Sequence, residues 1–288
     1  MEKSGKIKIV SGNTKEKKES KTVEKKQGKI KVGFQDEDQF DRIKRIGWIN
    51  IPKINKANVL VIGAGAIGNE VIKDLALSGF QKITIVDMDH VVKSNLSRCL
   101  FFREEDVKNK IYKVEAVKKR VSEFSKKVKI EAVPKKLEEL PESFYKKFDI
   151  IFGCVDNIMA RMKINGIAYH YNIPYIDGGT HGMLGKVQVM IPPSSPCIEC
   201  NLNVSHFKHI EELFTCSGRE DTTVFEPKEP AEITTTAVIS AVMVREGMKI
   251  ISDKKDLIMK DLFYYDGNSA KVEMFELHLN KNCLNHGQ

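Results

Sequence analysis

The fold is decided by the stretch Ala57-Asn-Val-Leu-Val-Ile-Gly63-Ala-Gly65-Ala-Ile-Gly68. The apolar run Ala57–Ile62 predicts a buried strand, and the helical spacing of apolar residues over Gly68–Ser78 predicts a helix that stops at Gly79. Glycines at this junction let the backbone turn tightly and come close to phosphate groups, and the start of the helix offers them N–H donors. The stretch therefore predicts a strand–turn–helix unit that binds an adenine nucleotide.

Strands and helices continue to alternate after this unit. Apolar runs predict strands at Lys82–Val86, Val128–Val133, Phe148–Cys154 and Pro174–Asp177, with helices at Lys110–Phe124 and Met159–Tyr171. This alternation is typical of an α/β, Rossmann-like, doubly wound parallel sheet. The pattern then changes, because Lys186–Ile191 and Lys271–His278 alternate in polarity on either side of a long helix predicted over Thr234–Ile251. We therefore expect antiparallel strands to extend the parallel half of the sheet.

Composition limits the class of protein. The 288 residues are 41% hydrophobic and 30% charged, which suits one large or two small soluble domains. There is no run of 18 apolar residues, and no apolar segment follows the lysine-rich start, so we expect neither a membrane span nor a secretory signal. These features favour a cytoplasmic protein.

The net charge of +8 belongs mostly to one end of the chain. Residues 1–31 hold eleven lysines against four glutamates, so the rest of the chain is nearly neutral. A lysine-rich, aromatic-poor segment cannot bury enough apolar surface to offset the entropy lost on ordering. We predict a disordered tail over residues 1–35 and one folded domain over residues 36–288. Nucleic acid is not an expected partner of that domain, and weak binding to nucleic acid or an acidic protein is left open only for the tail.

Charged residues beyond the first helix bear on which nucleotide binds. Asp87 ends a predicted strand 19 residues after Gly68, where a carboxylate can accept hydrogen bonds from the ribose of either NAD or ATP. A triphosphate with its metal needs further cations and a carboxylate, which Arg98, Lys113 and Asp156 can supply. Asp156 follows a strand, at the end of the sheet where doubly wound folds bind ligands. This set favours ATP with Mg²⁺ over NAD.

Several motifs resemble those of the ubiquitin-activating enzymes and their bacterial relatives that activate sulfur-carrier proteins. They are Asp87-Met-Asp-His-Val-Val-Lys-Ser-Asn-Leu-Ser-Arg98, Asp156-Asn157 with Arg161, Asp177-Gly-Gly-Thr-His-Gly182 and Cys197-Ile-Glu-Cys200. The resemblance covers roughly residues 40–286 and is strongest to the catalytic halves of the eukaryotic enzymes. It implies a ThiF/MoeB-like adenylation domain.

The resemblance also implies roles for matching residues. Asp87 would hold the ribose, and Asp156 would bind Mg²⁺. The phosphates would be held by Asn95, Arg98 and Lys113. Arg42 would reach the nucleotide of the other subunit, in a homodimer. The nucleotide-binding set is Gly63, Gly65, Gly68, Asp87, Asp89, Asn95, Arg98, Lys113, Asp156 and Asn157. The implied reaction is attack by the C-terminal glycine carboxylate of a ubiquitin-like protein on the α-phosphate of ATP, with release of pyrophosphate.

The chain departs from the family pattern at two places near these residues. Cys99 stands where the family usually has glutamine. The segment before Lys113 is two residues longer than usual, which leaves Lys110 as an alternative phosphate ligand, although Lys113-Val-Glu-Ala matches the family better.

Two short motifs predict a metal site. Cys197-x-x-Cys200 and Cys283-x-x-His286 together supply four soft or borderline ligands for tetrahedral zinc. In a cytosolic chain, such spacing indicates a metal or catalysis before disulfides. The family usually has a second Cys-x-x-Cys pair, so His286 is a substitution, and the alternative is a frayed terminal residue. We expect a structural zinc that ties the end of the chain to the segment at Cys197.

Cys216 is the predicted catalytic thiol. It follows Cys200 by 16 residues within an irregular segment, about residues 201–232, and the resemblance places the thioester-forming cysteine there. Lys208 and Arg219 are close in sequence and would favour the thiolate. The alternative is a spare thiol in an enzyme that only adenylates.

Three other functions compete with the favoured one. A sulfur-carrier activator would share the fold and the adenylation but would pass its acyl-adenylate to a sulfur donor. An NAD-dependent oxidoreductase would leave Arg98, Lys113 and Asp156 without a use, and a non-catalytic partner subunit would tend to lose them. The sequence therefore favours a homodimeric enzyme that activates a ubiquitin-like protein ending in Gly-Gly and hands it to a conjugating enzyme.

Overall fold

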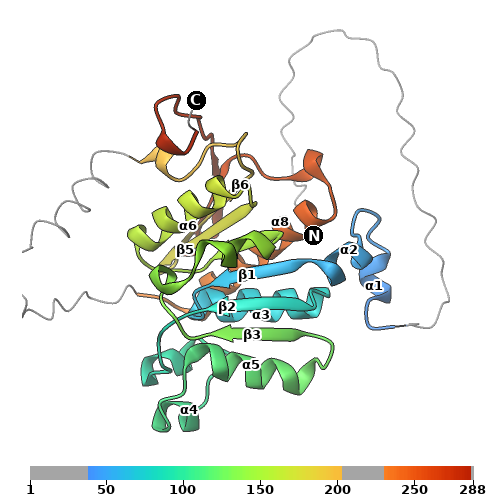
Figure 1. Cartoon of the computed structure of the whole chain (residues 1–288), viewed down its shortest axis with the longest axis vertical. Coiled ribbons are helices and arrows are strands. Elements are labelled where there is room, and N and C mark those ends of the chain that lie inside the picture. The colour runs from blue at the N-terminus through green and yellow to red at the C-terminus, as the bar shows by residue number, and fades with distance from the viewer. Residues whose placement is uncertain (1–37, 203–229, 287–288) are drawn as a thin grey trace, which may run out of the picture. The chain divides into compact units, whose positions relative to one another are not determined.

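A computed structural model describes residues 38–202 and 230–286 of the chain. One sheet of eight strands carries the fold of this part, in the order β3-β2-β1-β4-β5-β6-β7-β8 (Figure 1). The predicted tail over residues 1–35 and the predicted thiol Cys216 lie outside the described residues.

The sheet has a parallel half and an antiparallel half, as the sequence predicts. The parallel strands are β1 (Asn58–Ile62), β2 (Lys82–Val86), β3 (Lys129–Val133), β4 (Ile150–Gly153) and β5 (Tyr175–His181). The antiparallel strands are β6 (Leu184–Met190), β7 (Leu262–Asp266) and β8 (Lys271–Phe275). The chain leaves β1 toward β2 and β3, then returns to the other side of β1 with β4. Ligands of doubly wound sheets bind where the strand order reverses in this way, at the carboxyl ends of the strands.

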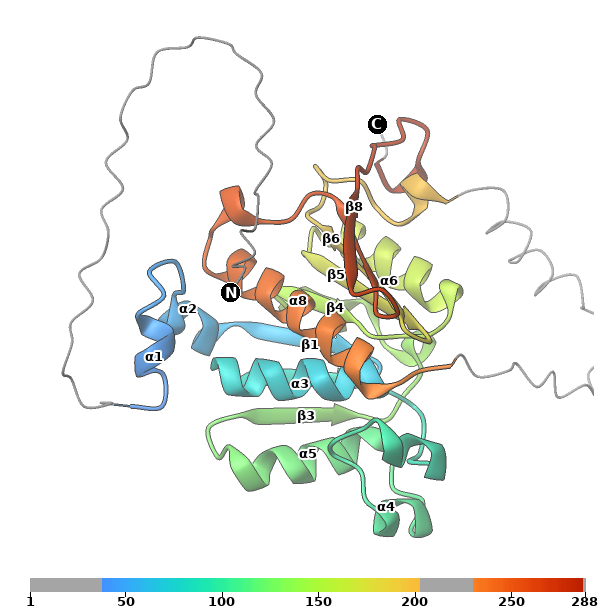
Figure 2. The ribbon, with the colours of Figure 1, turned by 180° about the vertical axis from the view of Figure 1, so that it is seen from behind.

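Helices cover both faces of the sheet and create two hydrophobic cores. The helices α3 (Ala66–Ser78), α5 (Lys113–Phe124) and α8 (Ile233–Ile251) pack on one face (Figure 2). The helix α6 (Ile158–His170) packs on the other. Strands buried between two helical layers are expected to be almost continuously apolar, as β1 is.

Most predicted elements are present, but several bounds differ: β5 runs to His181 where the prediction ends at Asp177, and β8 ends at Phe275 where the prediction ends at His278. Helix α3 ends at Gly79, whose φ of 102° lies in the left-handed region that glycine adopts without strain. Helix α5 begins at Lys113 and not at Lys110, because Lys110 has a φ of 49°, which is incompatible with a right-handed helix. The sequence analysis does not predict the strand β7, although Leu262-Phe-Tyr-Tyr is a short run of apolar and aromatic residues.

Short elements fill the connections. They are α1 (Asp41–Lys44), α2 (Ile51–Lys56), α4 (Glu104–Lys108), η1 (Lys93–Ser97), η2 (Leu137–Glu139), η3 (Glu142–Lys147), η4 (Glu199–Asn201), η5 (Lys255–Leu257) and η6 (Leu284–His286). Within residues 38–202 and 230–286, no helix combines the length and the apolar character needed to cross a membrane.

Candidate functional site

The glycine motif forms a tight loop between β1 and α3. Gly63 has a φ of 96°, and a β-carbon there would lie 2.4 Å from the carbonyl oxygen of Cys154. A β-carbon on Gly68 would lie 2.0 Å from the carbonyl oxygen of Gly63. A β-carbon on Gly65 would meet nothing within 4 Å. The first and third glycines therefore allow close packing, and the second leaves backbone facing open space, where a phosphate can approach.

Asp87 and Asp89 bring Lys113 to the edge of this loop. The Asp87 carboxylate accepts hydrogen bonds from the backbone N–H of Ala64, at 2.7 Å, and of Asp89, at 2.8 Å. The Lys113 ammonium lies 2.7 Å from the Asp89 carboxylate and 4.0 Å from that of Asp87. The backbone N–H of Lys113 also donates to the Asp89 carbonyl, at 2.8 Å. A cation therefore lies beside the residue predicted to bind ribose.

Burial and charge act against each other in this group. Burial raises the pKa of Asp87 above its ordinary value, although Lys113 and the two N–H donors counteract it. Burial alone would lower the pKa of Lys113, but the charges of Asp87 and Asp89 outweigh it and raise that pKa. Lys113 is therefore a cation at neutral pH.

The segment after β2 positions Asn95 and Arg98. Asn95 is buried, and its side-chain oxygen accepts from the backbone N–H of Val92, at 3.1 Å, which closes the turn η1. The half-buried Arg98 guanidinium donates to the Ser94 carbonyl, at 2.6 Å. Asn95 therefore shapes the turn, and Arg98 supplies a second cation. Lys110 is exposed and outside the Asp87–Asp89 group, which favours Lys113 of the two alternatives.

Asp156 and Asn157 follow β4 next to the glycine loop. The backbone N–H of Cys154 donates to the Ile62 carbonyl, at 2.7 Å, and this holds the end of β4 against the end of β1. The Asn157 side chain caps α6 by accepting from the backbone N–H of Ala160, at 2.8 Å. Asp156 is exposed at the carboxyl end of β4, so its carboxylate can reach a metal.

Arg161 and Asp177 form a buried ion pair beneath this segment. The Arg161 guanidinium donates to the Asp177 carboxylate and, at 2.6 Å, to the carbonyl of Val155. The Tyr175 hydroxyl also donates to Asp177, at 2.8 Å. The pair therefore supports the residue directly before Asp156. The sequence marked both residues as family motifs without assigning them a role, because their contact joins a helix to a strand.

Arg42 lies away from its own glycine loop. It is exposed on α1, and the neighbouring Phe40 ring is 3.2 Å from the position of a β-carbon on Gly79, at the end of α3. The 13 residues of α3 span about 20 Å, and the glycine loop is at the other end (Figure 2). Arg42 is therefore placed at the amino ends of the strands, opposite the nucleotide-binding residues predicted in its own chain.

The four predicted metal ligands come together at the end of the chain. The ligand atoms of Cys197, Cys200, Cys283 and His286 all lie within 4.8 Å of one another. The Cys197 sulfur is 3.8 Å from that of Cys200 and 3.5 Å from that of Cys283. Tetrahedral zinc, with bonds of about 2.3 Å to sulfur, separates two sulfurs by about 3.8 Å. The cluster therefore has the size of a zinc site.

The surroundings of His286 fit the same ion. Its Nδ1 lies 3.3 Å from the carbonyl oxygen of Pro193, and its Nε2 is buried without a hydrogen-bond partner. A metal-binding histidine usually donates one ring N–H to a carbonyl and offers the other nitrogen to the ion. The side-chain amide of Asn285 is also 3.9 Å from the Cys197 sulfur. His286 therefore lies beside the cysteines with a ring nitrogen available, as the prediction of a fourth ligand requires.

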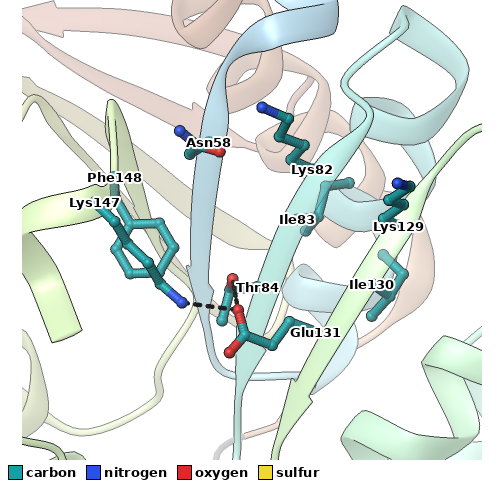
Figure 3. Close-up of a pocket in the computed structure, with 9 residues that line it drawn as sticks. All are labelled: Asn58, Lys82, Ile83, Thr84, Lys129, Ile130, Glu131, Lys147 and Phe148. Carbon is teal, nitrogen blue, oxygen red and sulfur yellow. Dashed lines mark hydrogen bonds and ion pairs between the residues drawn. The ribbon is translucent and has the colours of Figure 1, made fainter.

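A separate cavity of about 270 Å³ lies toward the amino ends of β1, β2 and β3, away from the glycine loop (Figure 3). Its lining includes Asn58, Lys82 and Lys129, the first residues of β1, β2 and β3. Glu131 inside it accepts from Thr84 and Lys147, both at 2.9 Å. None of the residues predicted to bind the nucleotide lines this cavity.

Known proteins share this sequence pattern. A model of the ThiF family matches residues 38–285. The catalytic subunit of the NEDD8-activating enzyme E1 of Arabidopsis thaliana is 30% identical over 294 residues, which cover 78% of this chain and 64% of that protein. Subunit 2 of the SUMO-activating enzyme of Dictyostelium discoideum is 36% identical over 160 residues, or 55% of this chain and 24% of that protein. The chain thus matches less than two thirds of the length of either relative.

Solved structures share the fold. The crystal structure of E. coli MccB with AMPCPP and selenomethionine MccA superimposes with a TM-score of 0.70 at 19% identity, over 88% of this chain and 75% of that one. E. coli MccB with ATP gives a TM-score of 0.66 at 21% identity, over 82% and 68%. Because the family model spans nearly all the described residues and the fold agrees, this chain belongs to the ThiF family.

Proposed function

We propose that this chain is an ATP-dependent activating enzyme that adenylates the C-terminal carboxylate of a ubiquitin-like protein. One observation carries the proposal: Asp87, Lys113, Arg98 and Asp156 lie on segments that follow the carboxyl ends of β2 and β4, and Asp87 is hydrogen-bonded to the glycine loop at Ala64 and paired with Lys113. Relatives that are named as NEDD8- and SUMO-activating enzymes support this choice of substrate class.

These groups suit an attack on the α-phosphate. A carboxylate oxygen of the terminal glycine bonds to the α-phosphorus, the bond from that phosphorus to the bridging oxygen breaks, and pyrophosphate leaves. Lys113 and Arg98 would neutralise charge on the phosphates, and Asp87 would hold the ribose. A Mg²⁺ ion bound through Asp156 would supply further positive charge at the same phosphates.

Transfer of the modifier to Cys216 is the proposed second step. A thiolate attacks the acyl carbon of the adenylate, the bond to the phosphate oxygen breaks, and AMP leaves. Cys99 and Cys154 are poor candidates, because burial raises the pKa of the Cys99 thiol to about 11 and that of Cys154 further. Three of the remaining four cysteines belong to the cluster of possible metal ligands, which leaves Cys216.

Three further parts of the proposal concern a second copy, a metal ion and a partner protein. Arg42 at the far end of α3 would serve the nucleotide of a second copy, so the active form would be a homodimer. Cys197, Cys200, Cys283 and His286 would hold a structural zinc. A conjugating enzyme would then accept the modifier from Cys216.

The test is ATP–pyrophosphate exchange with a panel of ubiquitin-like proteins that end in Gly-Gly, followed by non-reducing gels. We expect exchange with at least one modifier and an adduct that reductant removes. Cys216→Ser should keep exchange and lose this adduct, because a hydroxyl is a far weaker nucleophile than a thiolate. Cys99→Ser is the matched control and should keep both.

Other outcomes point to the competing functions. Pyrophosphate exchange without any reductant-sensitive adduct would mean that no thioester forms on the enzyme, and it would indicate a sulfur-carrier activator. Tight NAD binding with no exchange would indicate an oxidoreductase.

A further inference from the structure

Asn69 is a polar residue buried in the first turns of α3, directly after the glycine motif. Its side chain is fully buried, which is costly for an amide unless all its groups are bonded. The Nδ2 group donates to the carbonyls of Ala64, at 2.9 Å, and Gly65, at 3.1 Å. The Oδ1 atom accepts from the backbone N–H of Phe101, at 2.9 Å. Asn69 therefore connects the glycine loop to the segment that follows Arg98.

These bonds also help to set where the donors of the loop point, because the side-chain amide holds the Ala64 carbonyl and joins the backbone N–H of Asn69, at 2.9 Å, in holding that of Gly65. A trans peptide unit is planar and directs its C=O and N–H to opposite sides. Because the carbonyls of Ala64 and Gly65 point toward Asn69, the N–H groups of Gly65 and Ala66 face the other way. Ala64 is held a second time, because its own N–H donates to Asp87 at 2.7 Å. The loop thus presents its free N–H groups on the side away from the helix.

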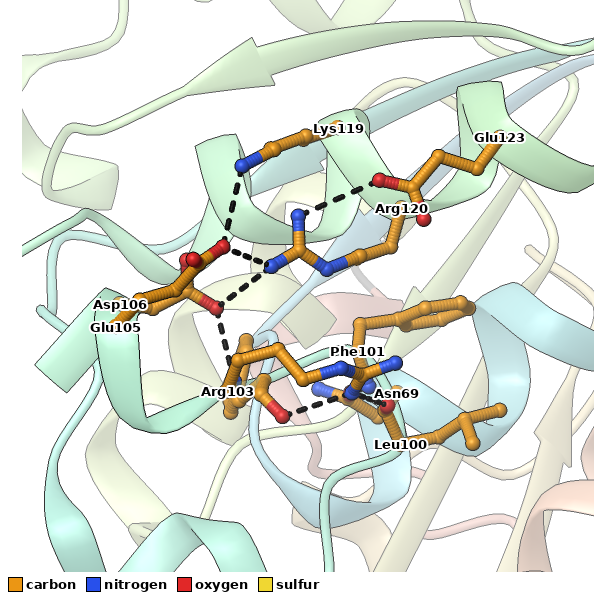
Figure 4. A network of polar contacts seen from close by, with 10 residues as sticks. Asn69, Leu100, Phe101, Arg103, Glu105, Asp106, Lys119, Arg120 and Glu123 are labelled. Carbon is orange, nitrogen blue, oxygen red and sulfur yellow. Dashed lines mark hydrogen bonds and ion pairs between the residues drawn. The ribbon is translucent and has the colours of Figure 1, made fainter.

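The segment on the other side of Asn69 is held by a polar network (Figure 4). The Arg103 guanidinium donates to the carbonyls of Leu100, at 2.8 Å, and Phe102, at 2.9 Å. The Arg103 N–H donates to Asp106, at 2.9 Å, and Asp106 lies 3.6 Å from the buried guanidinium of Arg120 on α5. Helix α5 begins with Lys113. The path therefore joins the glycine loop to the two segments that carry the cations.

We propose that Asn69 is a positioning residue that sets the glycine loop in register with the Arg98 segment and so determines the affinity for the triphosphate of a nucleotide. The inference rests on the proposed nucleotide site. Asn69 does not touch the phosphates itself. It acts through the N–H groups of Gly65 and Ala66 and through the backbone that leads from Arg98 to Phe101.

The experiment is calorimetric titration of the whole chain with α,β-methylene-ATP and Mg²⁺. Asn69→Asp keeps the shape of the side chain but points a carboxylate oxygen at two carbonyls, so the loop must shift. We expect the dissociation constant to rise roughly 10- to 100-fold with unchanged stoichiometry, because small misplacements in a site have effects of this size. A purely structural role would lower the folded fraction, which reduces stoichiometry and leaves the dissociation constant as it was.

Glu246→Ala is the matched control. Glu246 is also buried, and it accepts from the backbone N–H of Met259 at 2.9 Å, but it lies on α8. We expect this variant to lose stability without a change in the dissociation constant. Arg103→Ala provides a second variant, which should fold because Arg103 is exposed. It should weaken binding of the analogue by about threefold, because the segment that Asn69 connects to the glycine loop loses two hydrogen bonds.

The outcomes separate this inference from the proposed function. If the Asn69→Asp variant binds the analogue with the wild-type dissociation constant, the positioning role is wrong. If Asn69→Asp does not fold, a wild-type dissociation constant in the Arg103→Ala variant overturns the role instead. If wild-type protein binds the analogue but exchanges pyrophosphate with no modifier, the proposed function fails and the role of Asn69 stands. If wild-type protein does not bind the analogue, both fall.

Discussion

The metal cluster and the nucleotide site differ in how many of their predicted groups lie together in the described residues. The cluster has four ligand atoms within 4.8 Å of one another and a backbone carbonyl that orients His286. The nucleotide site has Asp156 exposed, Gly65 facing open space, and Arg42 at the far end of α3. A structural site can close around its ion, but a site that turns over substrates must stay open. Changes in the first should therefore reduce stability, and changes in the second should reduce activity.

The largest effect is expected from Cys283→Ser, which removes a buried ligand of the cluster. The wild-type chain should contain about one zinc by elemental analysis, and the variant should contain none. Because ion binding is coupled to folding, the variant should lose about 3 kcal/mol or more of unfolding free energy, measured in denaturant. His286→Ala should lose less, since three cysteines remain. Wild-type protein that is free of metal after purification without chelators would contradict the zinc site.

Asp156→Ala should reduce activity and leave stability almost unchanged. We expect ATP–pyrophosphate exchange to fall by about 10²- to 10³-fold, because the metal that neutralises the phosphates is lost. The unfolding free energy should change by no more than about 0.5 kcal/mol, because Asp156 is exposed. Asp256→Ala, another exposed aspartate, is the control and should change neither. Normal exchange by the Asp156 variant would remove Asp156 from the metal site.

Arg42→Ala tests whether a second copy completes the open site. Arg42→Ala and Asp156→Ala proteins should each be nearly inactive alone. Random mixing makes half of the dimers mixed, and each mixed dimer has one intact site, so activity should recover to about a quarter of wild type. The measurement is pyrophosphate exchange after the subunits are mixed.

Arg45→Ala is the control for this experiment, because Arg45 is also exposed on this short segment and pairs with Asp41. It should keep full activity. No recovery in verified mixed dimers would mean that Arg42 does not act across subunits, and a monomer by light scattering would count against the dimer.

The same contrast explains what could be predicted from the sequence. The four predicted metal ligands are two short motifs with the spacing of a chelating site, so their grouping could be predicted without a structure, and the structure brings them together. The strands β1 and β2 could be placed within one residue, because buried parallel strands are continuous apolar runs.

Long-range polar contacts could not be predicted. Asn69 bonds to Phe101 across 32 residues, and Arg161 pairs with Asp177 across a helix and a strand. Neither contact leaves a periodic signal, because each side chain only has to be compatible with its own element. The start of α5 was missed for a related reason, since the left-handed conformation of Lys110 has no signature in a lysine.

The smallest expected effect concerns Asp87→Asn, and its sign tests the contrast most directly. Burial raises the pKa of Asp87 in the folded protein above the ordinary value of 3.8, so the carboxylate destabilises the fold at pH values above its folded pKa. This cost disappears as the pH falls below 3.8, where the group is protonated in both states. Asp87→Asn should therefore gain unfolding free energy at pH 7, and the gain should vanish toward pH 3, while binding of α,β-methylene-ATP weakens. Asp89→Asn, whose side chain is 56% exposed, is the control for the loss of one negative charge beside Lys113. Urea unfolding at both pH values measures the difference. If Asp87→Asn instead loses stability at pH 7, the Asp87 carboxylate stabilises the fold, as the metal cluster is expected to do. The nucleotide site would then contribute to stability as well as to activity, and the contrast between the two sites would not hold.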